Sequence, residues 1–333
     1  MPLTHTRRRF LTTLSLTGAA GLLGAPRPFA AEPQPETTTV RLPKVPVICF
    51  APQYVCEEFL RDEGFSDIRY VDIKIKTGLE LSEELGHGSV DFASNSAVNH
   101  TFAIAAGAPI TIVSPVHGGC YELFAHGGIR SIADLKGKSV GAGGTEPLIS
   151  MFASWVGLDP KRDLTVVFDP AAKPLELFVA GKLDAYLGFP PEPQELHARG
   201  VGHVILSTAV DRPWSQYFCC MLAGNSEYVA RHPVATKRVI RALLKAADLC
   251  ASAPERSAQL LVKGGFAKRY DYALQTLRDV PYALWREYDA EDTVRFYALR
   301  AYELGFVKST PQKTIAENTD WRFFDELKRE LKT

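Results

Sequence analysis

Cysteine is the residue type whose chemistry the sequence raises first. None of the cysteines stands in a Cys-x-x-Cys pair, so zinc ribbons and thioredoxin-like redox motifs lack their usual spacing. The even count is compatible with disulfides in an oxidising compartment. We expect buried free thiols, with at least one disulfide as the alternative. The six cysteines are Cys49, Cys56, Cys120, Cys219, Cys220 and Cys250.

The sequence lacks the motifs of several enzyme and metalloprotein classes. It contains no His-Glu-x-x-His zinc motif. The pair Gly143-Gly144 does not open a Walker A loop, because no Gly-Lys-Ser or Gly-Lys-Thr follows it. We therefore predict no catalytic residue, no metal site and no cofactor, and we expect saturable binding of a small molecule without turnover.

Two short polar segments in the first third of the chain are candidates for ligand contact. Gln53 and Tyr54 stand in a turn after an expected strand, where Gln53 offers donors and acceptors and Tyr54 offers a ring for stacking. Ser94, Asn95 and Ser96 directly precede an apolar helix. These three side chains either bind ligand or only cap that helix.

Two further candidate segments lie in the middle of the chain. Gly144 and Thr145 precede a helix that is expected to start at Glu146, and glycines at a helix N-terminus let backbone N–H groups approach an anion, which the helix dipole also favours. The alternative is a plain turn with Thr145 as the helix cap. Glu192 lies in the proline-rich loop Phe189–Pro193, directly after an expected strand. Its alternative role is that of a solvated loop carboxylate.

These segments must be positioned by an alternation of strands and helices that runs to about residue 206. Such alternation is typical of parallel sheets with helices on both faces, so we expect an α/β protein. After Gly224 the pattern becomes helical. Strands are expected at 45–50, 68–75, 90–93, 110–113, 121–125, 139–141, 164–168, 183–189 and 204–206, and the late helices at 228–251, 253–263, 270–277, 291–304 and 323–331.

The N-terminal residues 1–31 have the pattern of an export signal. Three consecutive arginines followed by Phe-Leu, a mildly apolar stretch and a small-residue exit resemble a twin-arginine signal peptide. We expect cleavage after Ala30 or Ala31, then a flexible leader at 32–39 and a location in the periplasm. Twin-arginine substrates commonly fold before export in a reducing cytosol, which favours free thiols.

Charge and composition exclude several classes of partner. The 333-residue chain has 38 basic and 38 acidic side chains, and loss of the signal's four arginines leaves 34 basic side chains and a net charge of −4. The mature chain therefore offers no basic field for nucleic acid or for an anionic membrane surface. Hydrophobic residues make up 46%, which is ordinary for a globular protein. We expect a monomer.

Five segments of the chain carry a family likeness: Gly88–Ala93, Ala106–Ile110, Ser131–Lys138, Ala180–Ala185 and the pair His232-Pro233. Together they resemble the type II periplasmic substrate-binding proteins of ABC importers. The most similar group is the one for nitrate, sulfonates, taurine and thiamine-pyrimidine precursors. The likeness spans about residues 45–270 and concerns the scaffold, since Asp91 and Asp184 are expected to pin turns rather than to touch ligand.

The resemblance implies a two-lobed type II periplasmic-binding-protein fold. Each lobe is expected to be a mostly parallel sheet flanked by helices, with ligand in the cleft between the lobes. Lobe one comprises 40–116 plus 222–333, with the helical C-terminal region packed on it, and lobe two comprises 121–216. Two crossovers, at about 115–121 and 215–222, join them.

The implied crossovers add further candidate residues. Three aromatic residues are expected at the cleft floor, where they either stack on ligand or pack in the hinge: Tyr121, Trp214 and Tyr217. Cys120 lies on one crossover and Cys219-Cys220 on the other, so their Cα atoms could approach the distance of about 6 Å that a disulfide needs. We predict reduced thiols, because a bridge there would stiffen the hinge.

The implied function is capture of a small organic solute by hinge closure and its delivery to the membrane subunits of an ABC permease. The candidate loops carry Glu146 and Glu192 and no Arg or Lys, and a buried carboxylate beside an anion is costly. We therefore predict a neutral or cationic nitrogen heterocycle, such as an aminopyrimidine. The alternatives are a sulfonate- or nitrate-type anion, coupling to a sensor, and an enzyme similar to the thiamine-pyrimidine synthase, which carries several cysteines near the position of Cys219-Cys220.

Overall fold

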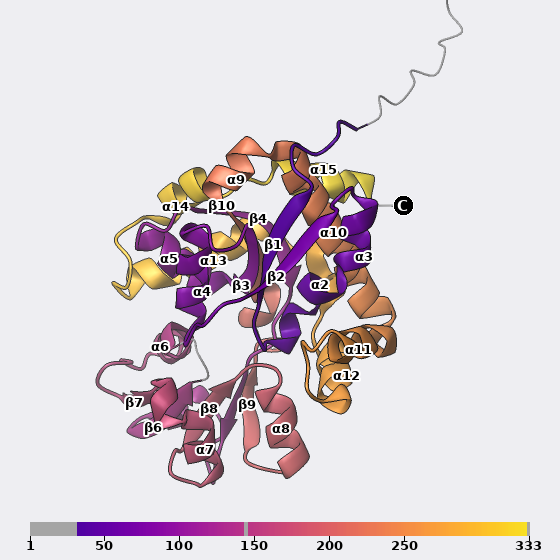
Figure 1. Ribbon diagram of the computed structural model, residues 1–333. Coiled ribbons are helices and arrows are strands. Elements are labelled where there is room, and N and C mark those ends of the chain that lie inside the picture. Colours follow the sequence, from indigo (N-terminus) through magenta and orange to yellow (C-terminus); the bar gives the residue numbers. More distant parts are fainter. Residues whose placement is uncertain (1–31, 143–145, 332–333) are drawn as a thin grey trace, which may run out of the picture. The chain divides into compact units, whose positions relative to one another are not determined.

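The strands that carry the candidate loops fall into three sheets (Figure 1). The computed structural model describes residues 32–142 and 146–331. Within these ranges β1 (Thr39–Lys44) pairs in parallel with β2 (Asp67–Asp72). The strand β10 (Cys220–Asn225) lies between β3 (Phe92–Ser96) and β4 (Ile110–His117) and is antiparallel to both. These two sheets share the upper part of Figure 1.

The third sheet has five strands in the order β7-β6-β8-β5-β9. Its strands β6–β9 lie with helices α7 and α8 in the lower part of Figure 1. The pairs β6–β7 and β6–β8 are parallel, whereas β5 is antiparallel to β8 and β9. The strands are β5 (Glu122–Ala125), β6 (Lys138–Ala142), β7 (Leu164–Val167), β8 (Ala185–Gly188) and β9 (His203–Ser207).

The predicted α/β class is confirmed, with sheets flanked by helices, and the pairing is more mixed than the alternation of elements suggested. The helices are α2 (Ala51–Val55), α3 (Glu57–Asp62), α4 (Gly78–Gly86), α5 (Ala97–Ala105), α6 (Glu146–Trp155), α7 (Pro174–Val179), α8 (Glu192–Arg199), α9 (Ser226–Arg231), α10 (Pro233–Ser252), α11 (Pro254–Lys263), α12 (Tyr270–Asp279), α13 (Ala290–Glu303), α14 (Pro311–Asn318) and α15 (Arg322–Glu330). Short 3-10 helices are η1 (Ile48–Phe50), η2 (Ile132–Leu135), η3 (Pro170–Ala172), η4 (Trp214–Gln216) and η5 (Tyr282–Arg286). No described helix is long and apolar enough to cross a membrane.

The first strand differs from its prediction. It runs over Thr39–Lys44 and buries Val40 and Leu42, while the predicted strand at 45–50 contains the 3-10 helix η1 and leads into α2. Pro46 and Pro52 flank this stretch, and a proline cannot donate to a strand ladder. The expected disorder at 32–39 does not extend to Glu36, whose carboxylate accepts the backbone N–H groups of Val234 and Ala235 at the start of α10.

The strand β10 was not predicted from the sequence. Its residues Cys220–Asn225 are a short apolar run without alternation, a pattern shared by buried strands and buried helix segments. Its position beside β4 brings two residues of the site described below together, because Cys220 pairs with His117 in the ladder. The two implied crossover segments therefore lie side by side at the end of β4 and the start of β10.

Two aspartates of the family-like segments bind residues 50 and 45 positions away in the chain, rather than pinning local turns as the sequence predicted. The Asp91 carboxylate is buried, pairs with Arg41 at 2.6 Å and accepts the Arg41 backbone N–H at 2.7 Å. The Asp184 carboxylate accepts both the backbone N–H and the hydroxyl of Ser139. Neither residue lines the cavity described below. These segments therefore stabilise the scaffold and position β3 and β8.

Candidate functional site

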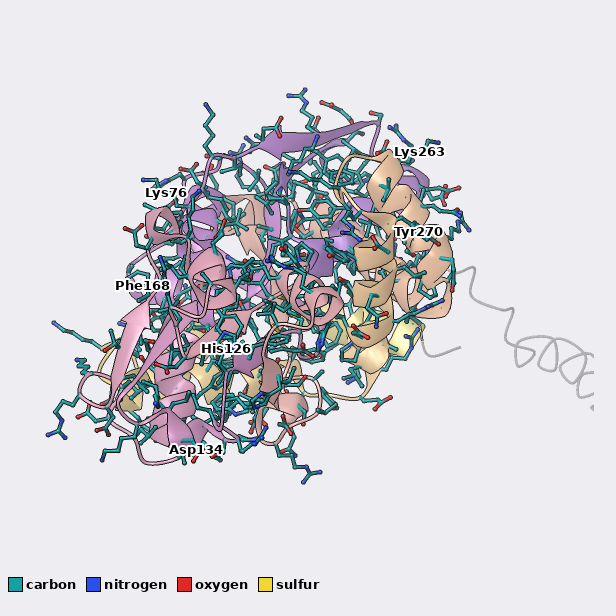
Figure 2. The ribbon with its side chains drawn as sticks, turned by 90° about the horizontal axis from the view of Figure 1, so that it is seen from below. Lys76, His126, Asp134, Phe168, Lys263 and Tyr270 are labelled. Atoms are coloured by element: carbon teal, nitrogen blue, oxygen red, sulfur yellow. The ribbon has the colours of Figure 1, made fainter. Side chains whose placement is uncertain are left out.

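A cavity of about 470 Å³ is lined by residues from two of the sheets, β3-β10-β4 and β7-β6-β8-β5-β9, and from segments that join strands and helices. Its size lies in the range of small-molecule sites, about 300–1,000 Å³. Apolar side chains from 45–50, 73–81 and 168–175 form much of its wall. Figure 2 shows two of the lining residues, Lys76 and Phe168, on the side of the molecule opposite Lys263 and Tyr270.

Asn95 and Ser96 line the cavity where β3 runs into α5. The Asn95 amide donates to the Gly78 carbonyl at 2.6 Å and to the Ser82 hydroxyl at 2.9 Å, and its oxygen accepts from the Ser96 backbone and the Asn99 amide. The Ser96 hydroxyl caps α5 by accepting the Asn99 N–H. Both residues thus hold the wall and also face the cavity.

Ser94, Gln53 and Tyr54 are buried and do not line the cavity. Gln53 joins two elements, donating to the Pro43 carbonyl at 3.0 Å and accepting the Ser94 N–H at 2.8 Å. Tyr54 stacks on Phe266 with ring centroids 4.3 Å apart, and its hydroxyl bonds the backbone of Val45. Gln53 and Tyr54 are buried because they lie on helix α2, which packs into the core, and not in the exposed loop that the sequence predicted.

Of the three crossover aromatics, Tyr121 lines the cavity and the other two do not. Trp214 is 1% exposed and packs edge-on against Phe152, while Tyr217 stacks on Phe296 with ring centroids 3.9 Å apart. For Trp214 and Tyr217 the structure shows the alternative, core packing. Both contact Phe296 of α13, an element that sequence reasoning had not placed near them.

The glycine-rich candidate loop is only partly described. Gly144 and Thr145 lie outside the described residues, so their predicted contact with ligand stays a prediction. Glu146 is the first residue of α6, as expected from the sequence, and its side chain is not described. The neighbouring Ala142, at the end of β6, lines the cavity.

Glu192 stands on the cavity wall as the first residue of α8, rather than in the loop expected from its prolines. Burial raises the pKa of its carboxyl to about 7, although hydrogen bonds from Tyr186 and from the Phe189 N–H oppose the rise. The buried Tyr186 also lines the cavity. Near neutral pH this carboxyl therefore accepts hydrogen bonds when ionised and donates one when protonated.

Two segments on the cavity wall were missed by sequence reasoning. One follows β2 and brings Lys76, and the other follows β7 and brings Lys173 and Glu176. All three charged side chains are exposed, so they lie at the rim. The loops predicted from the sequence carry no lysine, whereas this part of the cavity wall carries Lys76 and Lys173. The signal that identifies these residues is their position directly after a strand, the rule already applied to Glu192.

Three cysteines form another part of the wall: Cys49, Cys120 and Cys220. Their sulfur atoms and a ring nitrogen of His117 all lie within 4.8 Å of one another, and all four residues are buried. The Cys120 sulfur also lies 3.4 Å from that of Cys219, so these two cysteines are neighbours, as the disulfide alternative requires. All six cysteines are unbonded thiols in this structure, and their redox state in the cell stays a prediction.

His117 is the polar member of this cluster. A carbonyl oxygen only accepts, so the 2.5 Å contact between His117 Nδ1 and the Gly118 oxygen makes Nδ1 the donor. The other nitrogen, Nε2, is buried without a hydrogen-bond partner among the described residues. A buried polar atom without a partner lowers the stability of the fold by about 1–3 kcal/mol. Burial raises the pKa of Cys49, and contacts with the Cys120 and Cys220 thiols and with His117 lower it to well below its usual range.

The family model described as NMT1/THI5 like matches residues 57–257, more than half of the chain. The chain belongs to the NMT1/THI5-like family. This confirms the resemblance drawn from the five sequence segments. No curated protein sequence matches the chain at a significant level.

Solved structures share the fold of this NMT1/THI5-like protein. The periplasmic nitrate-binding protein NrtA from Synechocystis PCC 6803 has a TM-score of 0.75 at 16% identity, over 90% of each chain. The alkanesulfonate-binding protein SsuA from Xanthomonas axonopodis pv. citri, bound to MOPS, has a TM-score of 0.68 at 21% identity, over 88% of this chain and all of that one. The aliphatic sulphonate-binding protein SsuA from Escherichia coli has a TM-score of 0.66 at 21% identity, over 85% of this chain and 92% of that one.

Proposed function

We propose that this NMT1/THI5-like protein is the periplasmic solute-binding component of an ABC importer. The single observation that carries the proposal is the cavity of about 470 Å³, whose wall is mostly apolar, with the polar residues Asn95, Ser96 and Glu192 and three charged side chains at the rim. Its fold is that of periplasmic binding proteins, and the sequence predicts an export signal. Capture involves hinge closure about the crossovers at 115–121 and 215–222 and no chemistry, and the closed form is the one that the permease binds.

The proposed solute is a small, flat nitrogen heterocycle that is neutral or cationic. Glu192 accepts an N–H of the ligand, while Tyr121 and Phe189 offer aromatic surface beside it; their ring centroids lie 5.9 Å apart. Asn95 has both amide hydrogens and its oxygen engaged by protein groups, which favours a role in holding the wall over a role as a free donor. Tyr54, Trp214 and Tyr217 do not line the cavity, so Tyr121 and Phe189 are proposed to stack on the ligand in their place.

The charges of the wall favour this class over an inorganic anion. Lys76 and Lys173 are exposed at the rim, where solvent screens their attraction for an anion and Glu176 offsets one of the two charges. Glu192 lies deeper, and its ionised form repels an anion. A sulfonate- or nitrate-type solute is the second candidate, favoured by the two lysines, and would require Glu192 to be protonated in the complex.

A thermal-shift screen tests the ligand class, using aminopyrimidines, aromatic amines, taurine, alkanesulfonates, nitrate and bicarbonate. We expect stabilisation by heterocycles, because a solute that binds only the folded state raises the Tm. Glu192→Gln should weaken heterocycle binding by about 1–3 kcal/mol, the effect of losing a charged hydrogen-bond partner. The matched control is Glu195→Gln on the same helix, whose carboxylate pairs with Arg199 outside the cavity. Stabilisation by sulfonates or nitrate alone contradicts the heterocycle.

A turnover assay tests the absence of chemistry. Solute incubated with the protein should be recovered unchanged, with and without added iron. A cysteine-dependent and iron-dependent conversion would instead support the synthase-like alternative.

A further inference from the structure

We propose that Cys49, His117, Cys120 and Cys220 bind one Zn²⁺ or Cu⁺ ion. Three of its members line the cavity, and none of them is assigned a contact with the proposed solute, so the two proposals are tested separately. Three observations carry the inference: the spacing of the four ligand atoms, the state of the histidine, and the rigidity of the segments that hold them.

The spacing suits a single tetrahedral ion. Zinc binds a cysteine sulfur at about 2.3 Å, which places two sulfurs of one site roughly 3.8 Å apart. The four candidate atoms already lie within 4.8 Å of one another. A contraction of about 1 Å or less per pair, within reach of side-chain rotation, brings them around one ion.

The histidine has the hydrogen bonding of a metal ligand. A metal-bound histidine usually donates its other ring N–H to a carbonyl or a carboxylate, which fixes the tautomer. His117 donates from Nδ1 to its neighbour's carbonyl at Gly118, so Nε2 keeps its lone pair. That atom is buried and has no hydrogen-bond partner among residues 32–142 and 146–331. An ion bound there satisfies it.

The backbone brings the ligands together before any ion arrives. His117 ends β4 and pairs with Cys220 in the ladder, and the Cys219 N–H donates to the His117 carbonyl at 3.0 Å. Cys49 is held from the other side by the Tyr282 hydroxyl, which donates to its carbonyl at 3.1 Å. Four protein ligands make a closed site, on η1, β4, β10 and the segment after β4, and the pairing of β4 with β10 already holds most of it together without an ion.

The ligand set selects the class of ion. Three thiolates and one imidazole are soft to borderline donors, which suit Zn²⁺ and Cu⁺ and disfavour Mg²⁺ and Ca²⁺. Both candidates accept four-coordination by such groups, so the shared chemistry is that of a d¹⁰ cation bound by thiolate. Separate measurements with the two ions decide which one the site prefers.

The test uses the mature chain, fully reduced and stripped of metal by a chelator. Alkylation after denaturation should first count six free thiols. The same count is made on unreduced protein from the periplasm. Four free thiols there would indicate a disulfide, for which Cys120 and Cys219 are the neighbouring pair; such a bridge removes a ligand and would overturn the proposal for the exported protein. Competition with a chromophoric chelator should then show one Zn²⁺ or one Cu⁺ per chain. Cobalt substitution should give the sulfur-to-metal charge-transfer bands of a tetrahedral thiolate site.

Variants locate the site. Cys49→Ser and Cys220→Ser should each weaken binding by about 100-fold or more, because loss of an outer-shell partner alone lowers metal affinity about 10–100-fold. Cys250→Ser is the matched control, since Cys250 is equally buried but lies on α10, outside the cluster. Circular dichroism checks that each variant is folded. Absence of both ions from the wild type, or equal affinity in Cys49→Ser, Cys220→Ser and Cys250→Ser, overturns the proposal.

Discussion

Two walls of the same cavity are built in different ways. The sulfur wall, Cys49, Cys120 and Cys220, consists of side chains no more than 7% exposed on segments fixed by backbone pairing. The carboxylate wall, Glu176 and Glu192, stands at or near helix starts and is partly or fully exposed. The backbone fixes the positions of the side chains in the sulfur wall. In the carboxylate wall, the charge of Glu192 changes with pH.

The largest effect is expected from a change that breaks the backbone of the sulfur wall. A Cβ at Gly119, next to Cys120, would lie 2.0 Å from the Thr208 carbonyl oxygen, and backbone atoms cannot move away without disturbing the crossovers. Gly119→Ala should lower the free energy of unfolding by about 3 kcal/mol or more. Chemical denaturation measures it. In the control Gly128→Ala the new Cβ meets no atom within 4 Å, so an equal loss there would refute the steric argument.

A smaller, pH-dependent effect is expected at the carboxylate wall. Burial raises the pKa of Glu192 to about 7, above its unfolded value near 4.5, so its stabilising contribution is complete below pH 4.5 and is lost as the pH rises through 7. Between pH 4.5 and 8 the wild type should lose about 2 kcal/mol of stability relative to Glu192→Gln, after allowance for partial solvation.

Denaturation of both chains at several pH values checks this loss. Parallel stability curves for the wild type and Glu192→Gln would show that the carboxyl is solvated. The Glu195→Gln chain, altered on the same helix, should lose somewhat less stability than the wild type, because the Glu195 charge makes a minor contribution to the raised pKa of Glu192.

The smallest effect is expected at the rim. Lys76 is exposed, and exposed charges contribute little, so Lys76→Gln should change heterocycle affinity by less than about 0.5 kcal/mol. Calorimetric titration at two salt concentrations measures it. A loss above 1 kcal/mol that vanishes in high salt would favour the anion reading and would mean that the rim, rather than Glu192, selects the solute.

The sequence by itself determined the family, the α/β class and the role of residues whose partners are near in the chain. The cap of α5 at Ser96 was one of the two roles considered from the sequence, because a helix cap depends on local spacing, whereas the partners of Asp91 and Asp184 lie 50 and 45 residues away. Glu192 was placed near a ligand by the rule that loops after strands face a binding site. The same rule, applied to every strand, identifies Lys76 and Lys173.

Only the tertiary structure decided which side chains face the cavity. Gln53 and Tyr54 point into the core because η1 and α2 replace an expected strand, and Trp214 and Tyr217 are covered by Phe296, which lies about 80 residues further along the chain. The cluster of Cys49, His117, Cys120 and Cys220 has no sequence motif, because its members come from η1, β4, a crossover and β10. The pairing of β4 with β10 brings them together, and such long-range pairing leaves no local pattern in the sequence.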